Sequence, residues 1–297
     1  ANDKKITCTV TVNDFTGNTT TQLKDKSGRL LYKDSECKKP ATVADYNANG
    51  TYYTEPVYTG WQTIDGKVYY YNSNHQRVTG SQVISGISYT FGSDGALQQG
   101  SGKNGIDVSS HQGNIDWASV KAAGINFAII RVGYRGSQTG ALVEDSCFKK
   151  NIQGATANGI NVGVYFFTQA TTEAEAVEEA SMALTLCSGY NLSYPIFVDT
   201  ENGSGAARAN GLDKGTRTAC VAAFCKTIAN GGRKAGVYAS KSWYNNKIDA
   251  SAFSNYFIWV AQYNTTCNYK GKYNMWQYSS KGSVPGIKGN VDVNIAY

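Results

Sequence analysis

The chain of 297 residues has no long hydrophobic run. A helix that crosses a membrane needs about 18 or more consecutive apolar residues, so the sequence predicts no membrane span. The first residues carry no apolar signal core, which predicts a mature, already processed chain. No Lys/Arg run of the kind that binds nucleic acid occurs either, so we expect no nucleic-acid partner.

Residues that bind metals are scarce. The chain has only two histidines, and none of its seven cysteines lies in a Cys-x-x-Cys pair, so we expect no metal site and no cofactor. A Gly-x-Ser-x-Gly elbow, a His-Glu-x-x-His pair and a phosphate-binding glycine loop are also absent. Seven cysteines argue against a strictly reduced cytosolic protein, and the odd number leaves at least one thiol unpaired. Cys8 and Cys37 are candidates for one bridge.

Aromatic residues, in contrast, are abundant, with 21 Tyr, five Trp and ten Phe. Pyranose rings stack on aromatic faces, so this composition suits sugar binding, although it also suits many extracellular β-proteins. The net charge of +6 is concentrated after residue 98, where 18 Lys and Arg face 13 Asp and Glu. A mildly basic surface favours encounter with polyanions such as bacterial walls, although many secreted proteins share this property.

Residues 60–79 and 80–99 form a repeat with a period of 20. Each copy predicts a β-hairpin, with its turn at Asp65-Gly66 or at Ser85-Gly86, followed by an alternating aromatic strand. A single hairpin of this kind cannot bury its aromatic face, so we expect the two copies to stack.

The first copy, Gly-Trp-Gln-Thr-Ile-Asp-Gly-Lys-Val-Tyr-Tyr-Tyr at 60–71, resembles the choline-binding-like cell-wall-binding repeats of Gram-positive surface proteins. In that family, aromatic residues of neighbouring repeats hold quaternary ammonium groups by cation–π attraction. The second copy departs from the pattern, because Ser81 stands where Trp61 leads us to expect tryptophan. Two roles are therefore open for residues 59–98: a structural spacer, or a binding site for teichoic acid or another wall polymer.

The repeats separate two regions of different character. Before them, residues 1–58 contain an alternating run at 6–12 and shorter strand candidates at 30–32 and 51–54, which predict a small β-rich unit. After them, we predict a linker at 99–103 and a single barrel domain over the rest of the chain.

Residues 104–297 alternate strand-like runs with helical patterns, which is typical of a parallel β/α architecture. We expect strands at 105–108, 127–133, 162–168, 196–201, 236–239, 257–262, 275–278 and 291–295. Helices are expected at 117–123, 145–158, 173–186 and 214–229. Eight strands and about five helices predict an α/β fold with an irregular (β/α) barrel, smaller than the usual barrel of about 250 residues.

Four acidic residues interrupt the apolar strands. Asp107 lies near the end of the first strand, Asp199 and Glu201 end the fourth, and Asp292 lies in the last. An ionised carboxylate costs several kcal/mol to bury unless it is paired or hydrogen-bonded. Because active sites of such barrels lie at the C-terminal ends of the strands, we predict these four residues to be catalytic.

The pair Asp199 and Glu201 has the spacing i, i+2, which directs both side chains to the same face of a strand. Neighbouring carboxylates raise one another's proton affinity, so one of them stays protonated near neutral pH. Glycoside cleavage requires a neutral acid for the leaving oxygen and an anion that stabilises positive charge. We assign Glu201, which reaches further, as the acid and Asp199 as the anion. An isolated Asp-x-Glu usually lies on a solvated surface, so its place at the end of an apolar strand carries the prediction.

Residues 104–297 as a whole resemble glycoside hydrolase family 25, the Chalaropsis-type or phage-type lysozymes (N-acetylmuramidases). The likeness rests on Gly-Ile-Asp-Val-Ser-Ser-His-Gln-Gly at 105–113, Phe-Val-Asp-Thr-Glu at 197–201, Gly-Val-Tyr-Ala-Ser-Lys-Ser-Trp at 236–243, Trp-Val-Ala-Gln-Tyr at 259–263, Met-Trp-Gln-Tyr at 275–278 and Val-Asp-Val-Asn at 291–294.

This resemblance implies hydrolysis of the β-1,4 bond between N-acetylmuramic acid and N-acetylglucosamine in peptidoglycan by a secreted, wall-associated enzyme. It matches the family's acid to Glu201, and it implies that Asp107 and Asp292 tune proton affinity and hold the sugar. Candidate substrate-binding aromatics are Tyr165, Tyr238, Trp259 and Trp276, for each of which a packing role is equally open.

Two alternatives have to be compared with this reading. Chitinases and endo-β-N-acetylglucosaminidases of family 18 also end a fourth strand with Asp-x-Glu, but they carry further acids where this chain has Phe197 and Tyr194. The other alternative is a wall-binding protein with an inert barrel, against which the presence of all four carboxylates argues.

Overall fold

The computed structural model describes residues 22–24, 29–35, 37–47, 50–54, 58–64, 67–84, 87–98 and 102–297. The chain divides into two compact units. One comprises Ala1–Gly60 and Tyr71–Gln76, and the other comprises Trp61–Tyr70 and Arg77–Tyr297. The domain bounds expected from the sequence stay a prediction.

The described part of the N-terminal unit is held together by isolated β-bridges and a small core. Leu30 and Tyr32 form such bridges, and a 3-10 helix, η1, spans Val43–Asp45. The core side chains are Leu23, Leu31, Ala41 and Tyr52. The strand predicted at 6–12 and the bridge predicted for Cys8 lie outside the described residues.

Both repeats form antiparallel hairpins, as their sequence predicts. Their strands are β1 (Gly60–Ile64), β2 (Lys67–Tyr71), β3 (Gly80–Ile84), β4 (Ile87–Phe91) and β5 (Leu97–Gln98). The turn of each hairpin, at 65–66 and at 85–86, lies outside the described residues. The following turn places Gly95 at a φ of 76°, a conformation that glycine adopts without strain.

The two copies contact each other through their aromatic side chains. The Trp61 ring of the first copy lies with its centroid 4.6 Å from that of Tyr89 and 6.0 Å from that of Phe91, both in the second copy. Tyr89 and Phe91 are buried, and the Tyr89 hydroxyl donates to the backbone oxygen of Ala123 in the barrel at 3.0 Å. This aromatic cluster therefore stacks the copies and also attaches them to the barrel.

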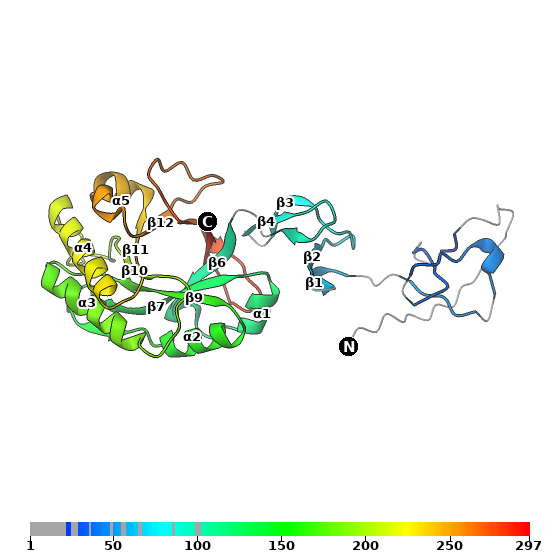
Figure 1. Ribbon diagram of the computed structural model, residues 1–297, viewed down its shortest axis with the longest axis horizontal. Coiled ribbons are helices and arrows are strands. Elements are labelled where there is room, and N and C mark those ends of the chain that lie inside the picture. Colours follow the sequence, from blue (N-terminus) through cyan, green and yellow to red (C-terminus); the bar gives the residue numbers. More distant parts are fainter. Residues whose placement is uncertain are drawn as a thin grey trace. The chain divides into compact units, whose positions relative to one another are not determined.

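Residues 103–296 form a closed barrel of eight strands, so the predicted fold class is confirmed (Figure 1). In sheet order the strands are β6 (Lys103–Val108), β14 (Val291–Ala296), β13 (Met275–Gly282), β12 (Phe257–Ala261), β11 (Ala235–Ser240), β10 (Ile196–Asp199), β9 (Asn161–Phe167) and β7 (Phe127–Arg135). Pairing of β6 with β7 closes the barrel, and a short strand, β8 (Leu142–Glu144), extends the sheet at β7. Strand β8 was not predicted.

Seven strands run parallel, but β14 runs antiparallel to both of its neighbours, β13 and β6. The sequence indicated a parallel β/α architecture with an irregular barrel, and the last strand is where the sheet departs from the parallel pattern. The physical reason is the short connection before β14. An antiparallel partner needs only a short link, whereas a parallel one needs a crossover of a dozen or more residues.

Helices connect the strands and cover the outside of the barrel. They are α1 (Trp117–Ala122), α2 (Phe148–Ala157), α3 (Glu173–Leu186), α4 (Lys214–Asn230) and α5 (Lys241–Asn246), with 3-10 helices η2 (Ser110–Gln112) and η3 (Ala250–Phe253). Helix α3 begins as predicted, because the Thr172 side chain accepts a hydrogen bond from the Glu175 amide. Helix α5 was not predicted. Within the described ranges, no helix is both long and apolar enough to cross a membrane.

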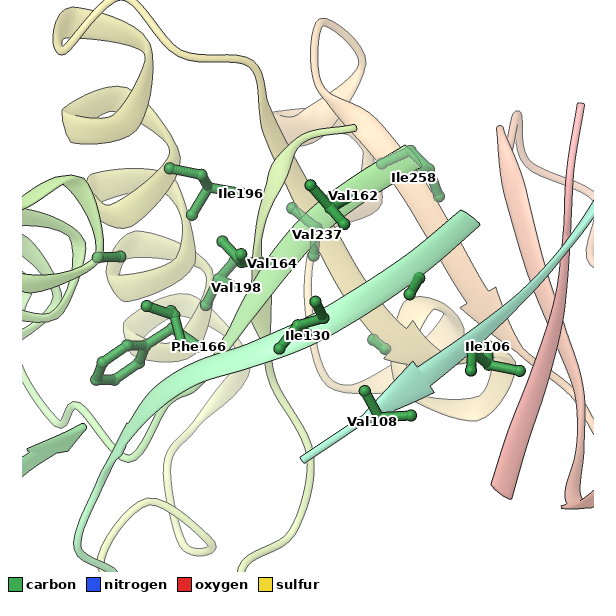
Figure 2. Close-up of a cluster of buried hydrophobic side chains, with 14 of the residues drawn as sticks. Ile106, Val108, Ile130, Val162, Val164, Phe166, Ile196, Val198, Val237 and Ile258 are labelled. Carbon is green, nitrogen blue, oxygen red and sulfur yellow. The ribbon is translucent and has the colours of Figure 1, made fainter. Parts of the chain in front are cut away.

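Alternation along the strands separates an outer layer from an inner one. Outward-facing apolar side chains pack together between the sheet and the helices (Figure 2). Inward-facing side chains, including Phe127, Phe197, Trp259 and Met275, form a separate cluster within the barrel. Because successive residues of a strand point to opposite faces, one outward-facing residue determines which of its neighbours along the strand face inward.

The five cysteines of the barrel carry free thiols, and three of them are buried. They are Cys147, Cys187, Cys220, Cys225 and Cys267. Burial raises the pKa of the Cys187 thiol to about 12, so this residue packs as a small apolar group and is unreactive.

Candidate active site

A cavity of about 350 Å³ opens at the mouth of the barrel. Seven of the eight residues proposed from the sequence line it: Asp107, Asp199, Glu201, Asp292, Tyr165, Tyr238 and Trp259. The eighth, Trp276, does not. Its neighbours Met275 and Gln277 face inward, so Trp276 points to the outer layer, where its indole donates to the backbone oxygen of Gln262.

The strands bring the four carboxylates together from distant parts of the chain. Asp107 on β6 and Asp292 on β14 are register partners, so their side chains are direct cross-strand neighbours. Asp199 is the last residue of β10 and lies beside Tyr238 of β11. Glu201 follows two residues after the end of β10, and not within the strand as expected. The antiparallel direction of β14 places the beginning of that strand, and with it Asp292, at the mouth where the parallel strands end.

Asp107 lies on the floor of the cavity and is held by two buried amides. One of its oxygens, Oδ2, accepts hydrogen bonds from Gln277 Nε2 at 2.9 Å and from Asn294 Nδ2 at 2.8 Å. Both amide side chains are at most 2% exposed. They fix the position of the carboxyl group, because hydrogen bonds are stronger in the protein interior than in water and an unpaired buried amide is costly.

Aromatic residues orient these two amides in turn. Asn294 Oδ1 accepts from the Trp259 indole at 2.9 Å, and Gln277 Oε1 accepts from the Tyr238 hydroxyl at 2.8 Å and from the Tyr263 hydroxyl at 3.1 Å. With the amide oxygens committed to aromatic donors, the amide NH₂ groups must face Asp107. Two of the aromatics predicted to bind sugar thus also position a carboxylate.

The buried carboxyl groups have strongly raised proton affinity. Burial, followed by the charge of Asp292, raises the pKa of Asp107 well above its ordinary value, against the effect of the two amide donors. Burial and the neighbouring Glu201 raise the pKa of Asp199 in the same way. One oxygen of Asp199, Oδ1, is buried without a hydrogen-bond partner, so it is available to a group that enters the cavity.

Glu201 and Asp292 lie nearer the opening. The walls of the cleft remove water from Glu201 and, together with the charge of Asp292, raise the pKa of Glu201 to about 6. Loss of water also raises the pKa of Asp292 to about 6. Groups with these values both hold and release a proton near neutral pH, as general acid catalysis requires.

Arg131 is a cation of the cavity wall that sequence analysis missed. Its guanidinium forms an ion pair with buried Asp145 at 2.7 Å and donates to the Ser110 hydroxyl at 3.0 Å. Its positive charge lowers the pKa of Asp199, against the larger effects that raise it. Arg131 therefore favours the ionised form of the carboxyl group that we assign as the anion.

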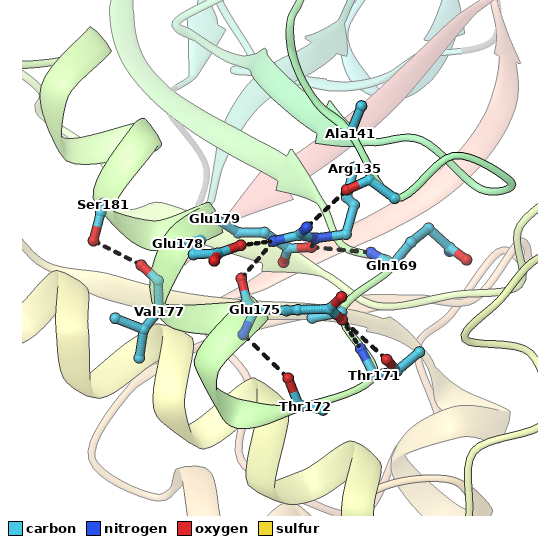
Figure 3. A network of polar contacts seen from close by, with 12 residues as sticks. Arg135, Ala141, Gln169, Thr171, Thr172, Glu175, Val177, Glu178, Glu179 and Ser181 are labelled. Atoms are coloured by element: carbon cyan, nitrogen blue, oxygen red, sulfur yellow. Dashed lines mark hydrogen bonds and ion pairs between the residues drawn. The ribbon is translucent and has the colours of Figure 1, made fainter.

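A network of ion pairs, buried at Arg135 and Glu179 and exposed at Glu178, lies beside the loops that line the cavity (Figure 3). Arg135 donates to Glu179 and to Glu178, at 2.9 Å each, and to the backbone oxygen of Gly140 at 2.7 Å. Arg208 donates to Glu175 at 2.8 Å through its side chain, while its backbone amide bonds to the Ser137 oxygen. These contacts hold the two loops that contribute Ser137 and Ser204 to the cavity.

Two further site residues were detectable in the sequence. Gln277 and Asn294 interrupt apolar strands just as the four acids do, and Asn294 is spaced i, i+2 from Asp292. The residues predicted for the site were carboxylates and aromatics, and these two amides were not among them. In the described part of the chain, no group of three His, Cys, Asp or Glu side chains is arranged to hold a metal ion.

A barrel whose mouth gathers several carboxylates of raised pKa, lined by tyrosine and tryptophan, defines a class of protein: the barrel glycoside hydrolases. The sequence profile described as glycosyl hydrolases family 25 matches residues 106–287, which is more than half of the chain. The chain belongs to this family. The profile of the choline-binding repeat matches residues 58–99. Both resemblances noted in the sequence are thereby confirmed.

Individual relatives agree with this family. Lysozyme M1 of Streptomyces globisporus is 30% identical over 204 residues, which cover 65% of this chain and 67% of that protein. The autolytic lysozyme of Clostridium acetobutylicum is 28% identical over 191 residues, covering 64% of this chain and 54% of that protein. Among solved structures, the bacterial lysozyme of Streptomyces coelicolor is 29% identical with a TM-score of 0.54, covering 66% of this chain and 92% of that one.

Proposed function

We propose that this chain is a muramidase that hydrolyses the β-1,4 bond between N-acetylmuramic acid and N-acetylglucosamine in peptidoglycan. The observation that carries the proposal is the convergence of four carboxylates at one barrel mouth, with a Glu201 pKa of about 6. Membership of family 25 and the similarity to lysozymes support the choice of peptidoglycan over other glycans.

In this mechanism Glu201 is the general acid. Four carboxylates in one cleft cannot all be ionised near neutral pH, because each negative charge raises the proton affinity of the others. The cleft therefore retains protons, and Glu201, which lies nearest the opening, delivers one to the glycosidic oxygen as the bond breaks.

Asp199 is the anion of the reaction. Positive charge that develops at the anomeric carbon stabilises the ionised form of Asp199, and Arg131 acts in the same direction. Asp107 and Asp292 maintain the raised proton affinity of Asp199 and Glu201. Asp107 is itself held in place by Gln277 and Asn294. Tyr165, Tyr238 and Trp259 offer faces and edges against which a sugar ring packs.

The test is digestion of purified peptidoglycan, borohydride reduction of the new ends, and mass spectrometry of the fragments. We expect reduced muramic acid at the new ends. Reduced glucosamine ends would instead identify an endo-β-N-acetylglucosaminidase of the chitinase-like type, and no release at all would identify an inert wall-binding barrel.

A second proposal concerns residues 59–98, which we propose attach the enzyme to a wall polymer such as teichoic acid, outside the cell. The match to the choline-binding repeat supports this role. Sedimentation of the intact protein with walls, before and after chemical removal of teichoic acid, tests it. Equal sedimentation with both preparations would leave the repeats as a structural spacer.

A further inference from the structure

Glu201 lies at the junction of two cavities. The first is the carboxylate-lined cavity of about 350 Å³, and the second, of about 450 Å³, lies beside it. Glu201, Tyr238 and Tyr263 line both. A glycan that crosses the proposed acid therefore has a space on either side of it.

The two cavities differ in charge. Asp107, Asp199 and Asp292 all line the first cavity and none of them lines the second. Apart from the shared Glu201, the second cavity has a single charged lining residue, Lys241, accompanied by the hydroxyl and amide groups of Ser240, Ser242 and Gln262.

The chemistry of the proposed reaction assigns a sugar to each side. The sugar that acquires positive charge must lie beside the anions, which are in the first cavity. The acid protonates the leaving oxygen, so the departing part of the glycan lies beyond Glu201. The second cavity is therefore where the leaving portion, at its reducing-end side, is received.

Lys241 is held in this cavity by neutral groups. Its ammonium group donates to Asn268 Oδ1, which also accepts a hydrogen bond from Gln262 Nε2. The backbone amide of Asn268 in turn donates to Gln262 Oε1 at 3.1 Å. Within the part of the chain that the structure describes, no ion pair between Lys241 and a carboxylate occurs. The lysine is thus positioned by amides while its positive charge is not neutralised by a protein carboxylate, which suits it to an anionic group of a ligand.

We propose that Lys241 binds a carboxylate carried by the leaving portion of the glycan, such as a stem-peptide carboxylate of a muramic acid residue, and thereby makes the enzyme selective for anionic strands. This inference rests on the proposed muramidase function. N-acetylglucosamine itself bears no carboxylate, so the group recognised belongs to a peptide-substituted muramic acid further along the strand. Neutral chitin-type glycans lack this group.

The test compares two forms of soluble, uncrosslinked peptidoglycan strands. One form keeps its stem-peptide carboxylates, and in the other they are converted to amides with carbodiimide and ammonium. Initial rates of reducing-end release give kcat/KM for each. The native enzyme should prefer the carboxylate form by about tenfold, the size expected for one charge-assisted hydrogen bond.

Three variants distinguish a specific role of Lys241 from a general effect of losing one positive charge. Lys241→Gln should abolish the preference, by raising KM for the carboxylate form while leaving the amidated form unaffected. Lys241→Arg should retain most of it. Lys247→Gln is the matched control. It removes the same charge from an exposed lysine that follows the last residue of the same helix and lines neither cavity.

The outcomes separate the two proposals. If the native enzyme cleaves both forms equally well, or if Lys241→Gln and Lys247→Gln reduce the preference to the same extent, the assignment of Lys241 is wrong and the muramidase proposal stands. If the native enzyme releases no reduced muramic acid from either form, the muramidase proposal itself fails.

Discussion

The barrel and the hairpin repeats are both rich in aromatic residues, but they use them differently. In the barrel, Trp259 and Tyr238 donate hydrogen bonds to the buried amides that hold Asp107. In the repeats, Trp61 packs on Tyr89 and Phe91. The difference arises from the neighbours, because the barrel interior supplies polar acceptors and the repeats supply other rings. Aromatic content by itself therefore did not distinguish sites from packing.

The largest effect should come from removing the proposed acid. Glu201→Gln keeps the size of the side chain but cannot donate the proton, so we expect kcat on peptidoglycan to fall by about 10²–10⁴-fold. The unfolding temperature should stay the same or rise, because an acid with raised proton affinity is removed. Glu173→Gln, an exposed change on α3, is the control. Unchanged lysis by Glu201→Gln would falsify the mechanism.

The comparison between barrel and repeats is tested by removing one tyrosine hydroxyl from each, Tyr238 in the barrel and Tyr89 in the repeats. Tyr238→Phe removes a donor to Gln277 and so loosens the support of Asp107, for which we expect a fall in kcat of about tenfold and a loss of about 1 kcal/mol in the free energy of unfolding. Tyr263 still donates to the same oxygen, which limits the loss. Steady-state kinetics and urea unfolding measure both effects. A stability loss without any kinetic change would show that Tyr238 only packs.

The pH dependence follows from Glu201, whose pKa is about 6 instead of the ordinary 4.5. Activity should fall as pH rises through 6, because the acid loses its proton. Asp292→Asn should move this limb of the kcat/KM profile to lower pH, since Asp292 contributes to the raised pKa. A limb that stays in place in this variant would exclude that coupling.

The same raised pKa predicts a change in stability. Between pH 4.5 and 6 the folded protein binds more protons at Glu201 than the unfolded chain does. The contribution of Glu201 to stability is therefore fully present below pH 4.5 and is lost as pH rises through 6. Thermal unfolding of the native protein and of Glu201→Gln at several pH values measures it, and identical pH dependence in both would contradict the assignment.

The smallest kinetic effect should come from the repeat. Tyr89→Phe removes the hydroxyl that donates to Ala123, so we expect a stability loss of about 1 kcal/mol with kcat unchanged within twofold. Set beside Tyr238→Phe, this result would confirm that the two regions use the same functional group for different ends. A kinetic defect as large as that of Tyr238→Phe would instead mean that repeat attachment affects the cleft.

Most strands and helices of the barrel could be predicted from the sequence, because hydrophobic alternation is a local signal. All eight strands and four helices appear near their expected positions, and α3 has the predicted bounds. Strand alternation also explains the aromatic that does not reach the cavity. Trp276 follows inward-facing Met275, so alternation along β13 directs its side chain outward.

What the sequence by itself determined is the order of the elements, the apolar faces that build the barrel, and the positions at which polar residues interrupt them. These follow from local periodicity and from the cost of burying charge. Tertiary structure alone decided that the pairing of β14 with β6 brings Asp292 opposite Asp107, and that Glu201 lies beyond the end of its strand. It also decided which donors orient Gln277 and Asn294. Proton affinity in the cleft depends on distances between residues far apart in the chain, and only closure of the barrel sets them.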